Sequence, residues 1–304
     1  MTRRPALGYA MVLTAATLWA LNGTVSKVII QSGGVTPERL TQVRATGAFL
    51  LLVAALLVWR RSTLGVSRRE LPFLAVFGVC GLALVAWFYF VAIDRLEIAV
   101  ALLIQYVAPV LVALYARYVL HEPVRRRIWA ALALAIVGLS LLLQLWNGIE
   151  LDTIGLLASV GAAVTFALYI LMADEGLKRR STSSLLTYGF LFAALFWTIV
   201  QPWTSFPWQL VDDSVSLLGR LESIELPVWL LMGWMVVLGT IVPFGLLVAA
   251  LRHIRPTRAG ILAMFEPVAA TVIAYAWLGE KLDPVQLVGA AVVLCGIVLA
   301  QTSR

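Results

Sequence analysis

Ten apolar stretches of about twenty residues follow one another along this chain, with only short polar links between them. An α-helix rises 1.5 Å per residue, so about 20 residues cross the ~30 Å hydrocarbon core of a bilayer. Lipid cannot hydrogen-bond to a bare peptide group, so such stretches must be helices that pair their backbones internally. We therefore predict an all-α membrane protein with ten transmembrane helices, at residues 7–29, 39–59, 71–93, 98–119, 128–146, 154–173, 184–203, 227–250, 258–278 and 284–301.

Little of the chain is left for anything but these spans. They occupy roughly 200 of the 304 residues, so a second, soluble domain does not fit. Only 13% of the residues are charged, about half the share in a soluble protein, which excludes an ordinary cytosolic enzyme. The two cysteines lie in apolar runs and the two histidines are far apart, so we expect no disulfide, metal or cofactor.

The positive charges are clustered in alternate links between the spans. Sixteen Lys and Arg residues fall on the side that holds both termini, four on the other side, and three within spans. Basic residues near short links stay in the cytoplasm, so we expect both termini to be cytoplasmic. The net charge of +7 is then a signal of membrane orientation, and we exclude nucleic acid as a partner. The longest link, about 204–226, is predicted to be a solvated outer loop, with a surface helix as a further possibility.

The chain resembles itself at a fixed spacing. A shift of 158 residues aligns Ala92–Leu141 with Ala250–Leu299 without a gap, with ten identities in fifty positions. A weaker match at a shift of 147 pairs Trp19-Ala20 with Phe166-Ala167. The identities include Pro109 with Pro267, Glu122 with Glu280 and Gly138 with Gly296. We predict two five-helix repeats, residues 1–148 and 149–304. Because five is odd, the second repeat would be inverted in the membrane, a design that recurs in secondary transporters.

Two proline-to-glutamate segments carry a family resemblance. Ala108–Ala113 reads Ala-Pro-Val-Leu-Val-Ala and is followed by His121-Glu122. Phe265–Ala270 reads Phe-Glu-Pro-Val-Ala-Ala and is followed by Leu278-Gly279-Glu280. Together with Trp19-Ala20-Leu21-Asn22 and Arg44, they resemble the drug/metabolite transporter superfamily, in its branch with two EamA-type repeats. The resemblance covers the whole chain.

The resemblance implies an exporter of metabolites, often amino acids, in the inner membrane of a bacterium. It also implies a central cavity lined chiefly by spans 1, 3, 4, 6, 8 and 9. The first repeat departs from the pattern, because His121 stands where the second has Gly279. We therefore expect the turn after span 4 to be built differently from the turn after span 9.

Glu266 is the most informative single residue, because it lies about eight residues, or ~12 Å, into its span. A carboxylate near the middle of a bilayer costs on the order of 3 kcal/mol, so it must be protonated, paired or facing water. We predict a site for a substrate amine or for a proton, with the proton as a hypothetical coupling ion. The alternative is a glutamate that only hydrogen-bonds to a neighbouring helix near Pro267.

Two prolines at equivalent depths loosen the backbone of their helices. Pro109 frees the carbonyl group of Gln105, and Pro267 frees that of Ala263. Such carbonyl groups could bind cargo, and the loosened helices could bend as part of a gate. The alternative is a packing kink in each helix.

Three polar residues of spans 1 and 2 are further candidates. Asn22 shares a helix face with Trp19 and Ser26, and we place that face in the cavity. Arg44 resembles the family's span-2 arginine and is predicted to form a structural salt link or an outer gate. Lys27, near the outer end of span 1, is predicted to anchor the helix by reaching the lipid headgroups.

Several aromatic rings lie deep in spans that the resemblance places around the cavity, where they would form an amphipathic wall. For each ring, ordinary helix packing is the alternative. The complete set of predicted substrate-binding residues is Trp19, Asn22, Trp87, Tyr89, Gln105, Tyr106, Tyr169, Trp234, Met264, Phe265 and Glu266. The predicted gating residues are Arg44, Pro109 and Pro267.

The function predicted from these patterns is export of small metabolites by alternating access, without covalent chemistry. No phosphate-binding Gly-x-x-x-x-Gly-Lys-Ser/Thr loop occurs, so this chain alone is no nucleotide-driven pump. The nearest alternative is a passive facilitator of similar solutes. A membrane enzyme acting on lipid and a non-transporting membrane subunit are the remaining alternatives.

Overall fold

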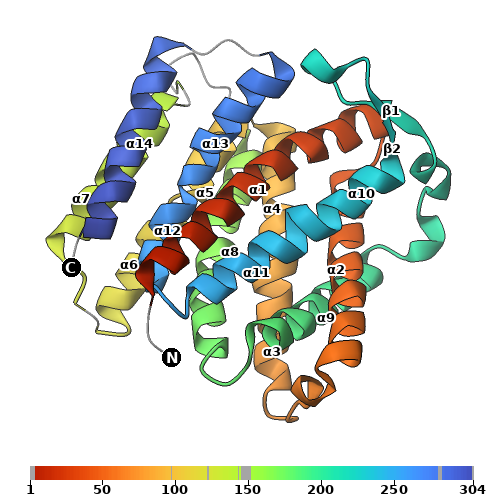
Figure 1. Ribbon diagram of the computed structural model, residues 1–304, viewed down its shortest axis with the longest axis horizontal. Coiled ribbons are helices and arrows are strands. Elements are labelled where there is room, and N and C mark those ends of the chain that lie inside the picture. Colours follow the sequence, from red (N-terminus) through yellow and green to blue (C-terminus); the bar gives the residue numbers. More distant parts are fainter. Residues whose placement is uncertain are drawn as a thin grey trace.

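The computed structural model is a bundle of long helices, and it describes residues 4–96, 98–121, 123–142, 144, 152–279 and 283–302 (Figure 1). The α-helices are α1 Pro5–Gly33, α2 Pro37–Trp59, α3 Leu71–Gly78, α4 Leu84–Arg95, α5 Ile98–Gln105, α6 Ala108–Tyr118, α7 Arg126–Leu142, α8 Thr153–Gly176, α9 Thr182–Val200, α10 Val228–Val236, α11 Val242–Ala250, α12 Pro256–Ala263, α13 Phe265–Ile273 and α14 Pro284–Thr302. Wider π-helical turns join some of them: η2 Val79–Ala83, η6 Val237–Ile241 and η7 Ala274–Leu278. Short 3-10 turns are η1 Arg61–Leu64, η3 Trp203–Ser205, η4 Trp208–Val211 and η5 Gly219–Leu221.

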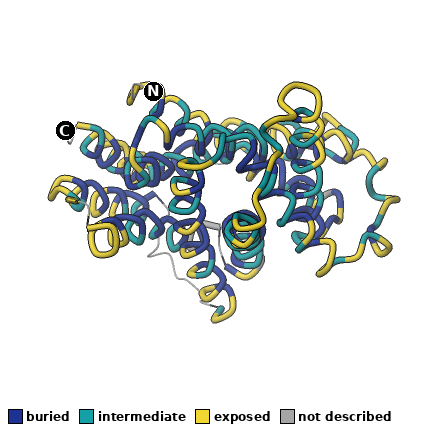
Figure 2. The backbone as a smooth tube through the Cα atoms, turned by 90° about the horizontal axis from the view of Figure 1, so that it is seen from below, coloured by how far each residue is buried: buried dark blue, intermediate teal, exposed yellow. Residues whose placement is uncertain are grey.

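Nine helical stretches within the described residues are long and apolar enough to cross a membrane, and each coincides with a predicted span. The tenth predicted span, 128–146, corresponds to α7, which has 17 residues. Part of its predicted end lies outside the described residues. Apolar side chains cover much of the outer surface of these helices, while the buried residues follow the interior of the bundle (Figure 2). That distribution is typical of a protein surrounded by lipid.

The predicted duplication reappears in the local backbone. The shift of 158 residues carries the π turn η2 onto η6, and α5 onto α12, with identical boundaries. It also relates His121 to Gly279, and both have a left-handed backbone, with φ of 54° and 74°. The two turns share this left-handed residue, which glycine adopts more easily than histidine, but they differ before it, as expected: α6 ends at Tyr118, whereas the second helix continues through the π turn η7 to Leu278. The paired glutamates Glu122 and Glu280 lie outside the described residues.

Helices α7 and α14 pack closely through glycines that the shift of 158 relates. A Cβ atom on Gly138 would lie 2.6 Å from the backbone nitrogen of Val293, and one on Gly296 would lie 2.8 Å from the carbonyl oxygen of Ala131. Small residues let helix backbones approach in this way. The contacts run in opposite directions along the two helices, so α7 and α14 are antiparallel.

Helices α2 and α9 form a second antiparallel pair. Each begins at a hydroxyl cap, Thr36 for α2 and Ser181 for α9, which are 145 residues apart. The guanidinium group of Arg39, at the start of α2, donates to the carbonyl oxygens of Pro202 and Ser205 after α9. At the other end, the Ser184 hydroxyl, at the start of α9, donates to a carbonyl oxygen just after α2.

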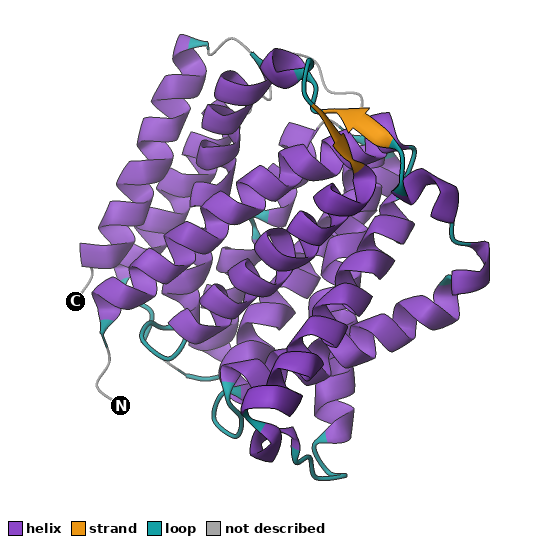
Figure 3. Ribbon diagram, turned by 45° about the vertical axis from the view of Figure 1, so that its right-hand side comes forward, coloured by secondary structure: helices purple, strands orange, loops and turns teal. Residues whose placement is uncertain are grey.

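The predicted outer loop contains a two-stranded antiparallel hairpin, β1 Ser214–Ser216 with β2 Glu225–Pro227 (Figure 3). Its apolar residues Val215 and Leu217 are buried among residues of α1 and α10. The indole of Trp277 donates to the Leu217 carbonyl oxygen, which ties the segment to the end of η7. The expected solvated loop is thus a folded cap. We call this end of the bundle, with residues 34–36 and 201–227, the hairpin end.

The opposite end of the bundle carries the clustered basic links, and we call it the basic end. It comprises residues 60–70, 177–181 and 251–255. Arg180 donates to the Glu70 carboxylate and to the Gly65 carbonyl oxygen, and Arg252 donates to the carbonyl oxygen of Arg180. The backbone amide of Arg4 reaches His253. The start of α1 therefore lies at the basic end.

Candidate functional site

A cavity of about 600 Å³ lies between the two repeats and reaches the hairpin end. The helices α1, α2, α4, α5 and α13 supply most of its wall, with single residues of α7, α8, α11 and α14. Ile30, Gln31, Pro37 and Leu278, at helix ends, form its rim. The volume lies in the range of pockets that hold small molecules.

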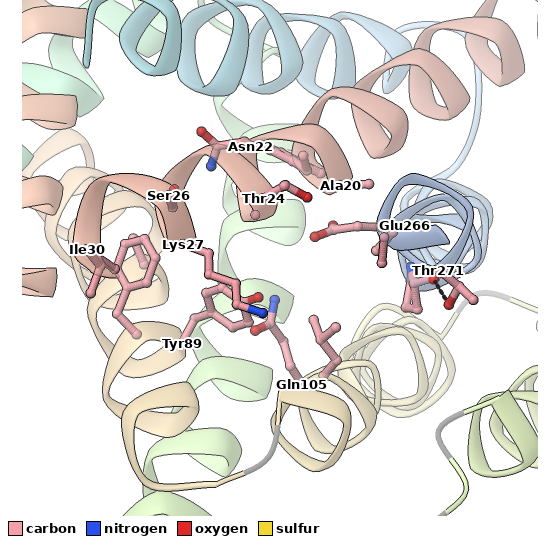
Figure 4. A pocket seen from close by; sticks show the side chains of 18 of the residues that line it. Ala20, Asn22, Thr24, Ser26, Lys27, Ile30, Tyr89, Gln105, Glu266 and Thr271 are labelled. Carbon is pink, nitrogen blue, oxygen red and sulfur yellow. Dashed lines mark hydrogen bonds between the residues drawn. The ribbon is translucent and has the colours of Figure 1, made fainter. Parts of the chain in front are cut away.

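Glu266 projects from the start of α13 into this cavity toward α1 (Figure 4). The hydroxyl group of Tyr106 donates a hydrogen bond of 2.5 Å to its carboxylate. Tyr106 itself is fully buried just after α5, so this bond joins the break of span 4 to the break of span 9. The carboxylate thus has one neutral partner and one side open to the cavity.

The helix breaks lie where the prolines predict them. Helix α5 ends at Gln105, four residues before Pro109, and α12 ends at Ala263, four residues before Pro267. Pro267 lines the cavity, whereas Pro109 is buried against Gly260 of α12. The backbone is interrupted at matching depths in both repeats, while a role in gating remains a prediction.

Arg44 lies on the cavity wall but is already held by protein groups. Its Nε donates to the hydroxyl of Thr240 at 3.0 Å, and its guanidinium carbon lies 5.9 Å from the centre of the Phe90 ring. Thr240 belongs to the π turn η6, so the widened turn of span 8 positions the arginine of span 2. The predicted salt link is replaced here by a hydroxyl and an aromatic face.

Three polar atoms of cavity-lining residues have no hydrogen-bond partner among the described residues: Asn22 Oδ1, Ser26 Oγ and Gln105 Oε1. These residues are almost fully buried, with exposed fractions of 6% for Asn22, 3% for Ser26 and 9% for Gln105. Buried polar atoms are seldom left unpaired in a folded protein. Ser26 and Gln105 therefore have the capacity to bind a polar solute or water, whereas Asn22 Oδ1 lies against Gly239 of η6.

Lys27 differs most from its prediction. The sequence predicts an anchor at the lipid headgroups, whereas Lys27 lines the cavity and extends toward Gln105 (Figure 4). Thr24, Thr271 and Gln286 are further polar residues of the wall that the sequence interpretation did not single out. One feature of the sequence indicated the cavity position of Lys27: it is a cation within a span, and Asn22 and Ser26, two other polar residues, precede it in the same span.

The predicted site residues divide into two groups. The cavity is lined by Trp19, Asn22, Arg44, Tyr89, Gln105, Glu266 and Pro267. The other group, Trp87, Tyr106, Pro109, Tyr169, Trp234, Met264 and Phe265, lies in the packed surroundings. Tyr106 reaches the cavity group only through Glu266, and the Tyr169 hydroxyl donates to the carbonyl oxygen of Phe244. Which of these residues bind cargo remains a prediction.

These features define a multi-pass membrane protein with a charged central cavity between two related halves. The profile of the EamA-like transporter family matches residues 6–144 and 153–302. The chain therefore belongs to the EamA-like transporter family, as the resemblance implied, and it is a transporter of that family.

Individual relatives support the same assignment. The chain is 31% identical over 300 residues to an uncharacterized transporter of Archaeoglobus fulgidus, covering 96% of this chain and 94% of the relative. It is 28% identical over 268 residues to the threonine/homoserine exporter RhtA of Escherichia coli, covering 88% and 80%. A solved crystal structure shares the fold, with a TM-score of 0.76 at 21% identity and coverage of 98% and 97%.

Proposed function

We propose that this protein exports small metabolites, amino acids among them, across the cytoplasmic membrane of a bacterium by alternating access. The observation that carries the proposal is a cavity between two related halves that contains Glu266 and opens toward the hairpin end. In such a mechanism the two halves rock about a central site. The name of the relative RhtA, a threonine/homoserine exporter, favours amino acids as cargo.

The proposed architecture is ten spans in two inverted repeats, residues 1–148 and 149–304. Equivalent helices of the two halves, α2 with α9 and α7 with α14, are antiparallel, which supports inversion. The clustered basic links support a cytoplasmic basic end, with both termini there and the hairpin end outside. The cavity then faces outward.

The test is efflux from proteoliposomes loaded with radiolabelled amino acids, beginning with threonine and homoserine. We expect wild-type protein to release cargo, and Glu266→Gln to reduce the rate by about tenfold or more, because a charged contact to the cargo is lost. Glu175→Gln is the matched control, since Glu175 is exposed and pairs with Lys178. No release of any metabolite by wild-type protein would contradict the proposal.

Coupling to protons through Glu266 is the finer part of the proposal. The passive facilitator is its rival, and a pH gradient separates the two. If protons drive export, an imposed gradient will move cargo against its concentration, and Glu266→Gln will abolish this uphill movement. Equal uphill movement by wild type and Glu266→Gln, or none by wild type, would contradict proton coupling through this residue.

A further inference from the structure

Lys27 and Glu266 place opposite charges on facing walls of the cavity. Lys27 extends from α1, and Glu266 projects from α13 toward α1 (Figure 4). Neither forms an ion pair within the described part of the chain. Arg44, the other cation of the wall, donates its Nε to Thr240 and lies beside the Phe90 ring, whereas no hydrogen bond or ion pair within the described residues engages Lys27. The two charges are therefore available to a solute.

The two side chains also differ in their position along α1. The Glu266 carboxylate points toward the part of α1 that holds Thr24, and Lys27 lies three residues further toward the hairpin end (Figure 4). Three residues correspond to a rise of about 4.5 Å. The backbone of Lys27 thus lies nearer the hairpin end than the part of α1 that Glu266 faces, and the Lys27 side chain extends from there toward Gln105.

Gln105 completes the positive side of the cavity. Its side chain and that of Lys27 point toward one another (Figure 4), and its amide oxygen has no protein partner although the residue is only 9% exposed. An amide carries two N–H donors besides its oxygen, and its orientation follows the partner that is present. An ammonium and an amide donor side by side suit a carboxylate, which accepts several hydrogen bonds.

We propose that Lys27, with Gln105, binds the carboxylate of the cargo while Glu266 receives its ammonium group. The cavity then selects zwitterions, which carry both charges, over amines that lack the carboxylate. This inference rests on the proposed transport function and adds the residue that distinguishes an amino acid from a simple amine. A lysine that served only as a headgroup anchor would extend away from the cavity.

The experiment uses efflux by the full-length protein in proteoliposomes. The twenty amino acids are screened first, and the one released fastest is compared with its own C-terminal amide, which keeps the ammonium group but has no carboxylate. We expect Lys27→Gln to reduce release of the amino acid at least tenfold and release of the amide less than twofold. Arg117→Gln, at an exposed cation outside the cavity, is the control and should leave both rates unchanged.

Three results would overturn the inference. Lys27→Gln could leave both rates unchanged, it could lower both equally, or the wild type could release no amino acid at all. In the first two cases the proposed transport function stands and only the role of Lys27 fails. In the third, release of other metabolites would preserve transport as the function, whereas no release of any solute would refute both. Unaltered thermal unfolding of Lys27→Gln in detergent separates a binding defect from misfolding.

Discussion

The part of the bundle that holds the cavity, near the hairpin end, and the packed part near the basic end use equivalent backbone positions with different side chains; we call them the open half and the closed half. Near the hairpin end, Asn22 of α1 packs on Gly239 of the π turn η6, and Asn22 lines the cavity. The equivalent positions near the basic end are Tyr169 of α8 and Gly81 of η2, related by shifts of 147 and 158. Tyr169 is fully buried and stacks on Phe166 and Phe77. The same helix crossing therefore forms a polar wall in one half and an aromatic plug in the other.

A second pair of contacts shows the same contrast. Arg44 meets Thr240 in the open half, whereas the equivalent positions in the closed half are Gly189 and Leu82. Gly189 has no room for a side chain, because a Cβ atom there would lie 2.7 Å from Leu82 Cδ1. The contrast teaches that equivalent helix contacts, related by the duplication, can border a cavity in one half and be filled by apolar side chains in the other, depending on side-chain volume and polarity.

Tyr169→Asn is the strongest test of the aromatic plug. Removing the fully buried ring leaves a cavity among Phe77, Phe166 and Phe244, so we expect a loss of about 3 kcal/mol in the free energy of unfolding. Thermal or denaturant unfolding in detergent measures the change. Asn22→Ala, at the equivalent position in a wall that already faces a cavity, should lose less than half as much free energy of unfolding. Equal losses for the two would contradict the difference between the halves.

Gly78→Ala tests the close packing of the closed half. The new Cβ atom would lie 2.4 Å from the carbonyl oxygen of Gly189, so α3 and α9 must separate. We expect a destabilisation of about 2 kcal/mol, in the range of overpacked cores. Gly245→Ala is the control, because its nearest neighbour would be 3.9 Å away. A control as unstable as Gly78→Ala would show that any added methyl group, rather than this contact, is harmful.

Substitutions at the left-handed residues of the two turns, Gly279 and His121, should change the free energy of unfolding by about 1 kcal/mol or less. Gly279→Ala places a Cβ atom on a left-handed residue and should cost about 1 kcal/mol. His121→Gly relieves the same strain at the equivalent turn but loosens the unfolded chain, so its effect should be smaller, at a few tenths of a kcal/mol. Unfolding measurements that rank the two variants in the opposite order would contradict the shared left-handed conformation of His121 and Gly279.

The smallest effect concerns the two arginines that link the repeats to each other at the ends of α2 and α9, Arg39 at the hairpin end and Arg180 at the basic end. The Arg180 guanidinium, by hydrogen-bonding to Glu70 at the basic end, lowers the pKa of that carboxyl group below its ordinary value. This contact thus stabilises the fold above the ordinary pKa, and the contribution is lost as pH falls through the lowered pKa. Arg39, at the hairpin end, donates to carbonyl, hydroxyl and amide oxygens, all of them neutral, so the stability that it contributes does not depend on pH in this range.

We expect the wild-type protein to lose a little more stability than Glu70→Gln between pH 7 and pH 3.5. The difference should stay below about 1 kcal/mol, because the pair is partly exposed and screened. Unfolding temperatures across that pH range measure it, with Arg39→Gln as a second variant. That variant should lower stability by the same amount at every pH. Parallel pH profiles for wild type and Glu70→Gln would contradict the role of the ion pair.

The sequence predicted the features that repeat and missed those that depend on one side chain meeting another. Apolar length located the spans, and the proline spacing located the breaks after Gln105 and Ala263, because both follow from backbone chemistry alone. The position of Lys27 was missed because its flexible side chain reaches equally well toward headgroups or into a cavity. The hairpin was missed because its burial depends on α1 and η7, which are distant in the sequence.

The two π turns that the duplication relates, η2 and η6, point to an origin older than the present protein. Such a turn interrupts the regular ladder of a helix and is rare in proteins generally. Here one lies at Val79–Ala83 and one at Val237–Ile241, in exact register across the duplication. A single origin before the gene doubled accounts for both more simply than two independent insertions. The ancestral half-length protein would then have carried this irregularity already, and its descendants have since kept the geometry while replacing the residues beside it.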